Sequence, residues 1–199
     1  MNKKLVTILA AALCSLAISV TAFAAEFISA DQARNIAAQL VPAGSTHLVT
    51  KDESYKHIPL YEVKFYDGAT NTAYEVEVLR NSGKVREFSM DAKTVQGSPQ
   101  IILSVEEIQN IVRAEYPNAV FTNVEIDHDD GLYEYDVDFY TTDLRGEMTI
   151  NPATGAVSEK EIKYFTDKQM LRDFVTTRPA LKELLKEALN ICLLYTSDA

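Results

Sequence analysis

Residues 133–140 read YEYDVDFY, and residues 61–66 read YEVKFY. In both stretches apolar side chains alternate with charged ones, and this period of two predicts a strand with one apolar and one polar face. Residues 135–140 align with residues 61–66 at an offset of 74. A strand of the same design is therefore expected twice in this chain.

The correspondence extends in both directions from these strands. Upstream, residues 28–36 align with 103–111 at an offset of 75. Downstream, residues 75–85 align with 147–157 at an offset of 72, and the order of the segments is kept. This pattern indicates a tandem duplication of one structural unit.

Each copy begins with a predicted helix. Ser29 and Ser104 are candidate N-caps, and both are followed by acidic residues in the first turn, where the helix dipole favours negative charge. Glu107 stands where it completes a capping box with Ser104. Pro42 and Pro117 are expected to stop the two helices.

Turn signals divide the rest of each copy into about four short strands. The expected fold class is α+β, with tandem repeats at 27–91 and 102–165, each one helix packed on its own small antiparallel sheet. Residues 166–191 have apolar residues at helical spacing and predict a C-terminal helical segment. This segment either packs on the second repeat or begins a truncated third one.

The helix with its early alanine, the Tyr-x-Val-x-Phe strand and the Gly-x-Val hairpin resemble the PepSY domain. That family occurs in propeptides of thermolysin-like proteases and in many secreted or membrane-anchored bacterial proteins. The resemblance covers both repeats. Its Asp-x-x-Thr-Gly hairpin is approximated by NPATG at 151–155, with Asn151 in place of Asp, whereas Leu79 stands there in the first repeat. The resemblance implies an interaction module without catalytic residues.

Both ends of the chain have the character of segments outside the folded unit. Lys3 and Lys4 precede an apolar run and a small-residue site ending at Ala24, which predicts a secretory signal peptide at 1–24. The alternative is a retained membrane anchor, for which the apolar run is short. Residues 192–199 match the translation of a sequencing-library adapter, so we expect an adapter-derived tail, with a natural tail as the alternative.

Composition excludes several classes of protein. The 199 residues are 47% hydrophobic, enough to bury a core, and the net charge of −10 disfavours a nucleic-acid partner. Cys14 and Cys192 both lie in the predicted end segments, which leaves no cysteine for a disulfide or a zinc site. His47, His57 and His128 are scattered, and no nucleophile motif or phosphate loop occurs. We therefore expect no catalytic residue and no cofactor.

Two sets of carboxylates are the candidate binding residues. Asp127, Asp129 and Asp130 approach the spacing of a calcium loop, but Gly131 falls one position early and the final glutamate is missing. A polar hairpin turn is the expectation there, with weak calcium binding as the alternative. The second set is expected to form an acidic sheet face, which is either simply solvated or a docking surface for a basic partner or a cell-wall polymer: Glu62, Glu75, Glu77, Glu134, Asp136 and Asp138.

Together these patterns predict a bacterial protein that is secreted or located in the cell envelope and is not an enzyme. The first hypothesis is that it binds an extracytoplasmic peptidase and either inhibits it or assists its folding. The alternative is an envelope-associated protein that binds a cation or a cell-wall polymer through its acidic faces. No nucleic-acid partner is expected, and no membrane association after signal cleavage.

Overall fold

The computed structural model describes residues 27–166. The predicted signal peptide, the adapter-like tail and all but the first residue of the predicted segment at 166–191 lie outside the described residues. The elements within the described part follow in this order: α1 Ala30–Ala37, β1 Thr46–Tyr55, β2 Ile58–Asp67, β3 Thr72–Leu79, β4 Val85–Ala92, α2 Val105–Glu115, β5 Val120–Asp129, β6 Leu132–Tyr140, β7 Leu144–Ile150 and β8 Val157–Tyr164.

Both helices begin at the predicted N-caps. The hydroxyl oxygens of Ser29 and Ser104 accept hydrogen bonds from the backbone N–H groups of Gln32 and Glu107, whose side chains accept in return from the N-cap N–H groups. The capping box predicted for α2 is confirmed, and α1 has one as well. Each cap contributes about 1 kcal/mol to stability. Neither helix within residues 27–166 is long and apolar enough to cross a lipid bilayer.

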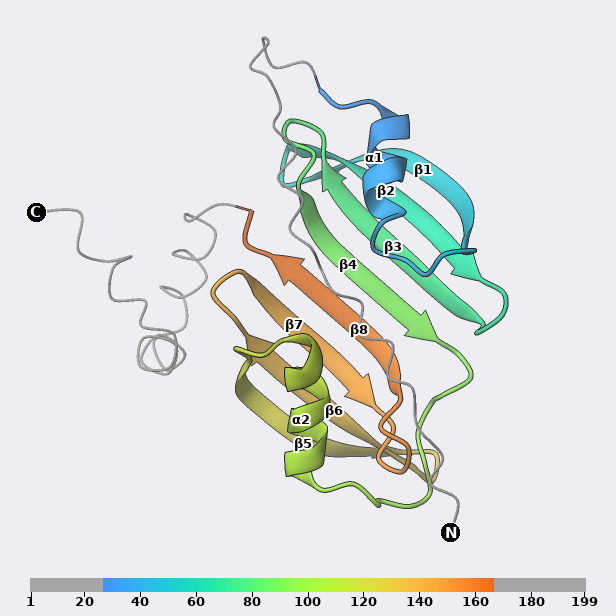
Figure 1. Cartoon of the computed structure of the whole chain (residues 1–199), viewed down its shortest axis with the longest axis vertical. Coiled ribbons are helices and arrows are strands. Elements are labelled where there is room, and N and C mark those ends of the chain that lie inside the picture. Colours follow the sequence, from blue (N-terminus) through green and yellow to red (C-terminus); the bar gives the residue numbers. More distant parts are fainter. Residues whose placement is uncertain (1–26, 167–199) are drawn as a thin grey trace, which may run out of the picture.

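The strands form one eight-stranded antiparallel sheet in the order β1-β2-β3-β4-β8-β7-β6-β5 (Figure 1). The expectation of two repeats, each with a helix on its own four-stranded sheet, is therefore wrong. β4 and β8 pair with each other from Glu87 and Lys163 to Asp91 and Glu159. The sequence pattern missed this junction because alternation specifies the two faces of a strand and not the strand that lies beside it.

The junction between β4 and β8 has local twofold symmetry. The two strands correspond at the sequence offset of 72, and Ser89 pairs with Glu161, its own counterpart. At the same offset Glu87 corresponds to Glu159 and Asp91 corresponds to Lys163. The pair of Glu87 and Lys163 is therefore the counterpart of the pair of Glu159 and Asp91. A local twofold axis therefore passes through the pair of Ser89 and Glu161 and exchanges the two halves of the sheet.

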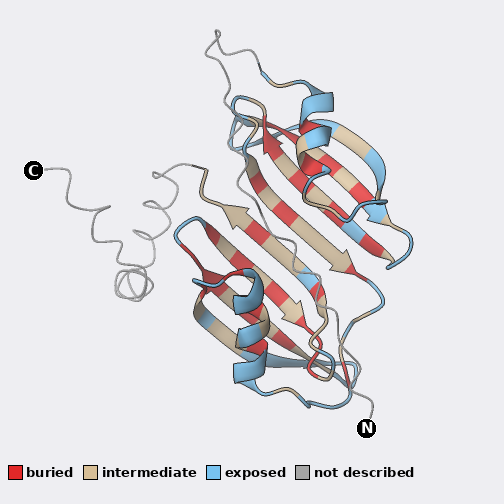
Figure 2. Ribbon diagram, in the orientation of Figure 1, coloured by how far each residue is buried: buried red, intermediate tan, exposed pale blue. Residues whose placement is uncertain are grey.

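Both helices cover the same face of the sheet (Figure 1), and the core lies between them and that face. Ala33 and Ala37 of α1 and Ile108 and Val112 of α2 are fully buried. Buried and less buried residues alternate along the strands (Figure 2), and one cluster of buried side chains extends across both halves. Neither helix covers the opposite face, which we call the open face.

The segment between β4 and α2 is held by the side chain of Asn151, in the turn after β7. Its carbonyl oxygen accepts hydrogen bonds from the N–H groups of Ala153 and Thr154, at 3.0 and 3.1 Å. Its amide nitrogen donates to the carbonyl oxygens of Gln96 and Gly97, at 3.2 and 2.6 Å. An aspartate could provide only the first pair of bonds, so the asparagine joins the turn to the connecting segment.

Replacing Asn151 by aspartate is expected to destabilise the protein by about 2 kcal/mol, since a buried carboxylate would face backbone carbonyl oxygens in place of a donor. The measurement is urea denaturation at pH 7. Asn81→Asp, in an exposed turn, is the matched control and should change the free energy of unfolding by less than about 0.5 kcal/mol. Equal effects of the two substitutions would contradict the role given to the Asn151 amide.

Candidate functional site

Charged and polar side chains on the open face form three rows that cross the strands. Residues directly opposite each other in antiparallel strands point to the same face, so the register defines each row. The mixed row consists of Lys51, Glu62, Glu77, Glu87, Lys163 and Arg145. The middle row consists of Lys64, Glu75, Ser89, Glu161, Glu147, Asp138 and Asn123. The acidic row consists of Asp91, Glu159, Thr149, Asp136 and Glu125.

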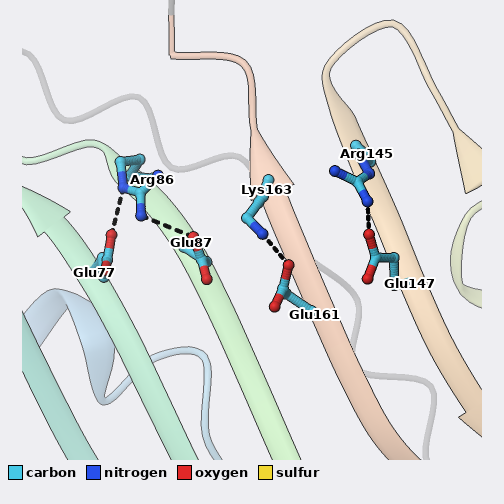
Figure 3. A network of polar contacts seen from close by, with 7 residues as sticks. All are labelled: Glu77, Arg86, Glu87, Arg145, Glu147, Glu161 and Lys163. Carbon is cyan, nitrogen blue, oxygen red and sulfur yellow. Dashed lines mark hydrogen bonds and ion pairs between the residues drawn. The ribbon is translucent and has the colours of Figure 1, made fainter. Parts of the chain in front are cut away.

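Around the mixed row, basic side chains lie next to carboxylates (Figure 3). Arg86, next to the bulge between β3 and β4, donates to Glu77 through Nε and to Glu87 through Nη2, the latter at 2.8 Å. Lys163 pairs with Glu161, and Arg145 pairs with Glu147. The charges at this end of the open face are therefore balanced.

Arg86 is the most enclosed cation of this group. Its side chain is only 9% exposed, and its guanidinium carbon lies 4.1 Å from the centre of the Tyr55 ring. Burial raises the pKa of Glu87, with the negative charges of Glu77 and Glu161 adding to the rise and Lys163 and Arg86 opposing it. Arg86 thus neutralises two half-buried carboxylates while its own charge is covered by an aromatic ring.

A groove of about 720 Å³ lies over the middle and acidic rows and is lined by every member of both. Its two lysines are already engaged: Lys64 lies 2.8 Å from Glu75, and Lys160 lies 2.5 Å from Glu115 at the end of α2. The carboxylates that line it are Glu75, Asp91, Glu125, Asp136, Asp138, Glu147, Glu159 and Glu161. The groove is therefore strongly acidic.

Negative charge in the groove is least compensated along the acidic row. Lys93 pairs with Asp91, but among residues 27–166 no basic side chain lies within 4.0 Å of the carboxylates of Glu125, Asp136 or Glu159. Burial raises the pKa of Asp136. The carboxylates of Asp127, Glu134 and Glu125 add to that rise, and the hydrogen bond from the Thr149 hydroxyl, at 3.0 Å, opposes it.

The residues predicted for an acidic face all point to the open face, but they differ in their surroundings. Glu62 and Glu77 are neutralised by Lys64 and Arg86. Glu134 accepts a hydrogen bond from the N–H of Gly97 at 2.7 Å. The remaining three line the groove: Glu75, Asp136 and Asp138.

Sequence reasoning missed Asp91, Glu125 and Glu159, which complete the acidic row, and Arg86, which neutralises the other end. The alternation along residues 120–129 could have indicated Glu125, because it has the same parity as Asp127 and Asp129. No local signal could have placed Asp91 beside Glu159, because they lie on strands that meet only at the junction of the two halves.

The predicted calcium candidates lie at the end of β5 and in the turn that follows. Asp127 pairs with Glu134, and Asp130 has a φ of +49°, next to Gly131 at +82°. Within residues 27–166 no group of three or more His, Cys, Asp or Glu side chains is arranged to hold a metal ion. The turn is thus a tight hairpin connection with left-handed residues.

The three histidines have local contacts. His47 Nε2 lies 2.9 Å from the Thr50 hydroxyl, and its ring packs edge-on against Phe65. The His128 ring lies 4.3 Å from that of Tyr133, while His57 occupies the turn between β1 and β2 at a φ of +71°. They belong to three separate places in the sheet, and none lines the groove.

Comparison with protein families finds a model described as "Peptidase propeptide and YPEB domain", PepSY, at residues 27–94 and again at 102–161. A second model, described as an L1 transposable element dsRBD-like domain, matches residues 149–187, a smaller part of the chain that extends beyond the described residues.

Two solved structures are similar in part. The Bacillus megaterium YpeB C-terminal domain has 13% sequence identity and a TM-score of 0.42, and the match covers 67% of this chain and 62% of that one. A candidate lipoprotein from Clostridium difficile 630 has 14% identity and a TM-score of 0.29, covering 60% of this chain and 83% of the other. The chain thus matches less than two thirds of the YpeB domain.

Proposed function

Because this chain belongs to the PepSY family, whose model describes peptidase propeptides and covers most of residues 27–161, we propose that it binds an extracytoplasmic peptidase without being an enzyme itself. In this proposal the protein either restrains the peptidase or assists its folding. Its place of action is outside the cytoplasm, in the cell envelope or the medium. Family membership is the observation that carries the proposal.

The shape of the sheet supports the open face as the docking surface. Both helices pack on the other face, and the groove of about 720 Å³ gives the open face a concave area that spans strands of both halves. Docking at a strand edge is less favoured, because both edge strands carry a bulge, at 47–49 in β1 and at 121–123 in β5. Bulges interrupt the ladder of backbone groups that an added strand would need.

The proposal predicts that the purified chain from residue 25 to 191 slows hydrolysis of a fluorogenic peptide by secreted peptidases of the producing organism. It should also elute with the peptidase in size-exclusion chromatography, and by itself it should leave the peptide intact. Restraint and folding assistance are separated by adding the protein either to the mature enzyme or to the unfolded enzyme during refolding. Absence of a complex and of any effect in both assays would overturn the proposal.

The alternative, binding of a cation or a cell-wall polymer, is supported by the uncompensated carboxylates of the acidic row. It is tested in the same series by sedimentation with purified cell walls, with and without calcium. Sedimentation with cell walls, without a peptidase complex, would favour this alternative.

A further inference from the structure

The acidic row lacks a cation that its counterpart in the other half possesses. Three residues of the mixed row have counterparts in the acidic row. Glu62 corresponds to Asp136 at the sequence offset of 74, and at the offset of 72 Glu77 corresponds to Thr149 and Glu87 to Glu159. The local twofold axis through Ser89 and Glu161 exchanges these positions. The two ends of the open face can therefore be compared position by position.

Arg86 is the key difference. It donates to Glu77 and Glu87, and its counterpart at the offset of 72 is Ser158. The Ser158 hydroxyl is fully buried and donates to the backbone oxygen of Thr149 at 3.2 Å. The second half thus has the same backbone position but no guanidinium group above its carboxylates.

The outer two strands of each half also differ in charge between the two halves. Four positions on β1 and β2 of the first half include one cation and one aromatic ring. Their four counterparts on β5 and β6 of the second half are all acidic. The substitutions, written from first to second half, are Lys51 to Glu125, Glu53 to Asp127, Tyr55 to Asp129 and Leu60 to Glu134. The second half is thus more acidic on β5 and β6 than the first half is on β1 and β2, and among residues 27–166 the one ion pair in the acidic row joins Lys93 to Asp91, at the end of the row away from these strands.

We propose that the acidic row is the docking site for a basic segment of the partner protein, and that one of its arginine or lysine side chains takes the place that Arg86 takes in the first half. Glu159 would then receive the cation as Glu87 receives Arg86, with Thr149 at the position of Glu77, and Asp136 flanks the site from the next strand. This rests on the proposed function, because it assigns a docking surface to the same interaction module. Charge complementarity and the internal example of Arg86 both point to this occupant.

The dimensions of the row define a suitable ligand. It crosses β4, β8, β7, β6 and β5, which at a strand spacing of about 4.8 Å gives a length of about 19 Å. An extended peptide of about six residues covers that length, with every second side chain facing the groove. A peptide with a basic residue at every second position therefore presents about three basic side chains to the groove. The raised pKa of Asp136 shows that burial and the neighbouring carboxylates disfavour its ionised form, which a bound cation would stabilise.

The test uses the fluorescently labelled peptide Arg-Ser-Arg-Ser-Arg-Ser and fluorescence anisotropy at low salt. The double variant Asp136→Asn/Glu159→Gln should bind at least tenfold more weakly than the unmodified protein, and the affinity of the unmodified protein should fall as salt is raised. The matched control is Asp31→Asn/Glu106→Gln, which removes the same charge from the exposed surface of the two helices and should change affinity less than twofold. Circular dichroism melting of all three proteins establishes that they are folded.

Equal affinity of the unmodified protein and the Asp136→Asn/Glu159→Gln variant would overturn the docking site. Equal losses in the two double variants would overturn it as well, because the peptide would then respond to net charge alone. The peptidase assay distinguishes failure of the docking site from failure of the proposed function. Peptidase binding that is unchanged in the Asp136→Asn/Glu159→Gln variant would leave the proposed function standing and remove only the acidic row as its docking site.

Discussion

Gly146→Ala is expected to destabilise the protein by about 2–3 kcal/mol, because the space beside Gly146 is already filled. A Cβ atom at this position would lie 2.2 Å from Cζ of Phe139, on the paired strand. The Phe139 ring is fully buried and packs against Tyr116 and Phe121, with ring centres 4.9 and 6.5 Å away, so it cannot move without disturbing the core. Equilibrium denaturation in urea measures the loss.

The matched control is Gly68→Ala, where the nearest atom to an added Cβ is 3.7 Å away, an ordinary contact. This variant should stay within about 0.5 kcal/mol of the unmodified protein. Adding Phe139→Leu to Gly146→Ala should recover part of the loss, since the smaller side chain vacates the space that the methyl group needs. If Gly146→Ala were as stable as Gly68→Ala, the close packing of Phe139 on Gly146 would be disproved.

Arg86→Met is the second substitution with a large expected effect, about 3–5 kcal/mol at pH 7. It leaves Glu77 and Glu87, each 19% exposed, without the cation between them. Arg34→Met, which breaks an exposed ion pair with Asp31 on α1, is the control and should cost less than about 1 kcal/mol.

The loss in Arg86→Met should also depend on pH. The pKa of Glu87 is already raised above its ordinary value of 4.5, and removing Arg86 takes away one of the charges that oppose the rise. A carboxyl group with a raised pKa in the folded state destabilises the fold when ionised, and stability returns as pH falls through the window between the raised value and 4.5. Urea denaturation at pH 7 and pH 5 should therefore give a smaller difference from the unmodified protein at pH 5. A difference that stays constant or grows towards pH 5 would contradict this account.

Part of the candidate site was predictable from local pattern. The alternation in residues 133–140 correctly gave Asp136 and Asp138 the opposite face from Val137 and Phe139, which lie in the core. The pattern could not reveal that Glu77 is neutralised while Asp136 is not. That difference depends on Arg86, which stands nine residues after Glu77 and is brought to it by the pairing of β3 with β4 and by a bulge.

The sequence by itself determined the helix starts at Ser29 and Ser104, the apolar and polar faces of the strands and the membership of the PepSY family. These follow from contacts within a few residues or from residue patterns along the chain. Only the tertiary structure decided that β4 and β8 join all eight strands into one sheet and that three rows of charge cross its open face. The physical reason is that pairing between strands 72 positions apart depends on which strand edges meet in the folded chain. Alternation along one strand determines which face each side chain occupies, but it does not specify the neighbouring strand.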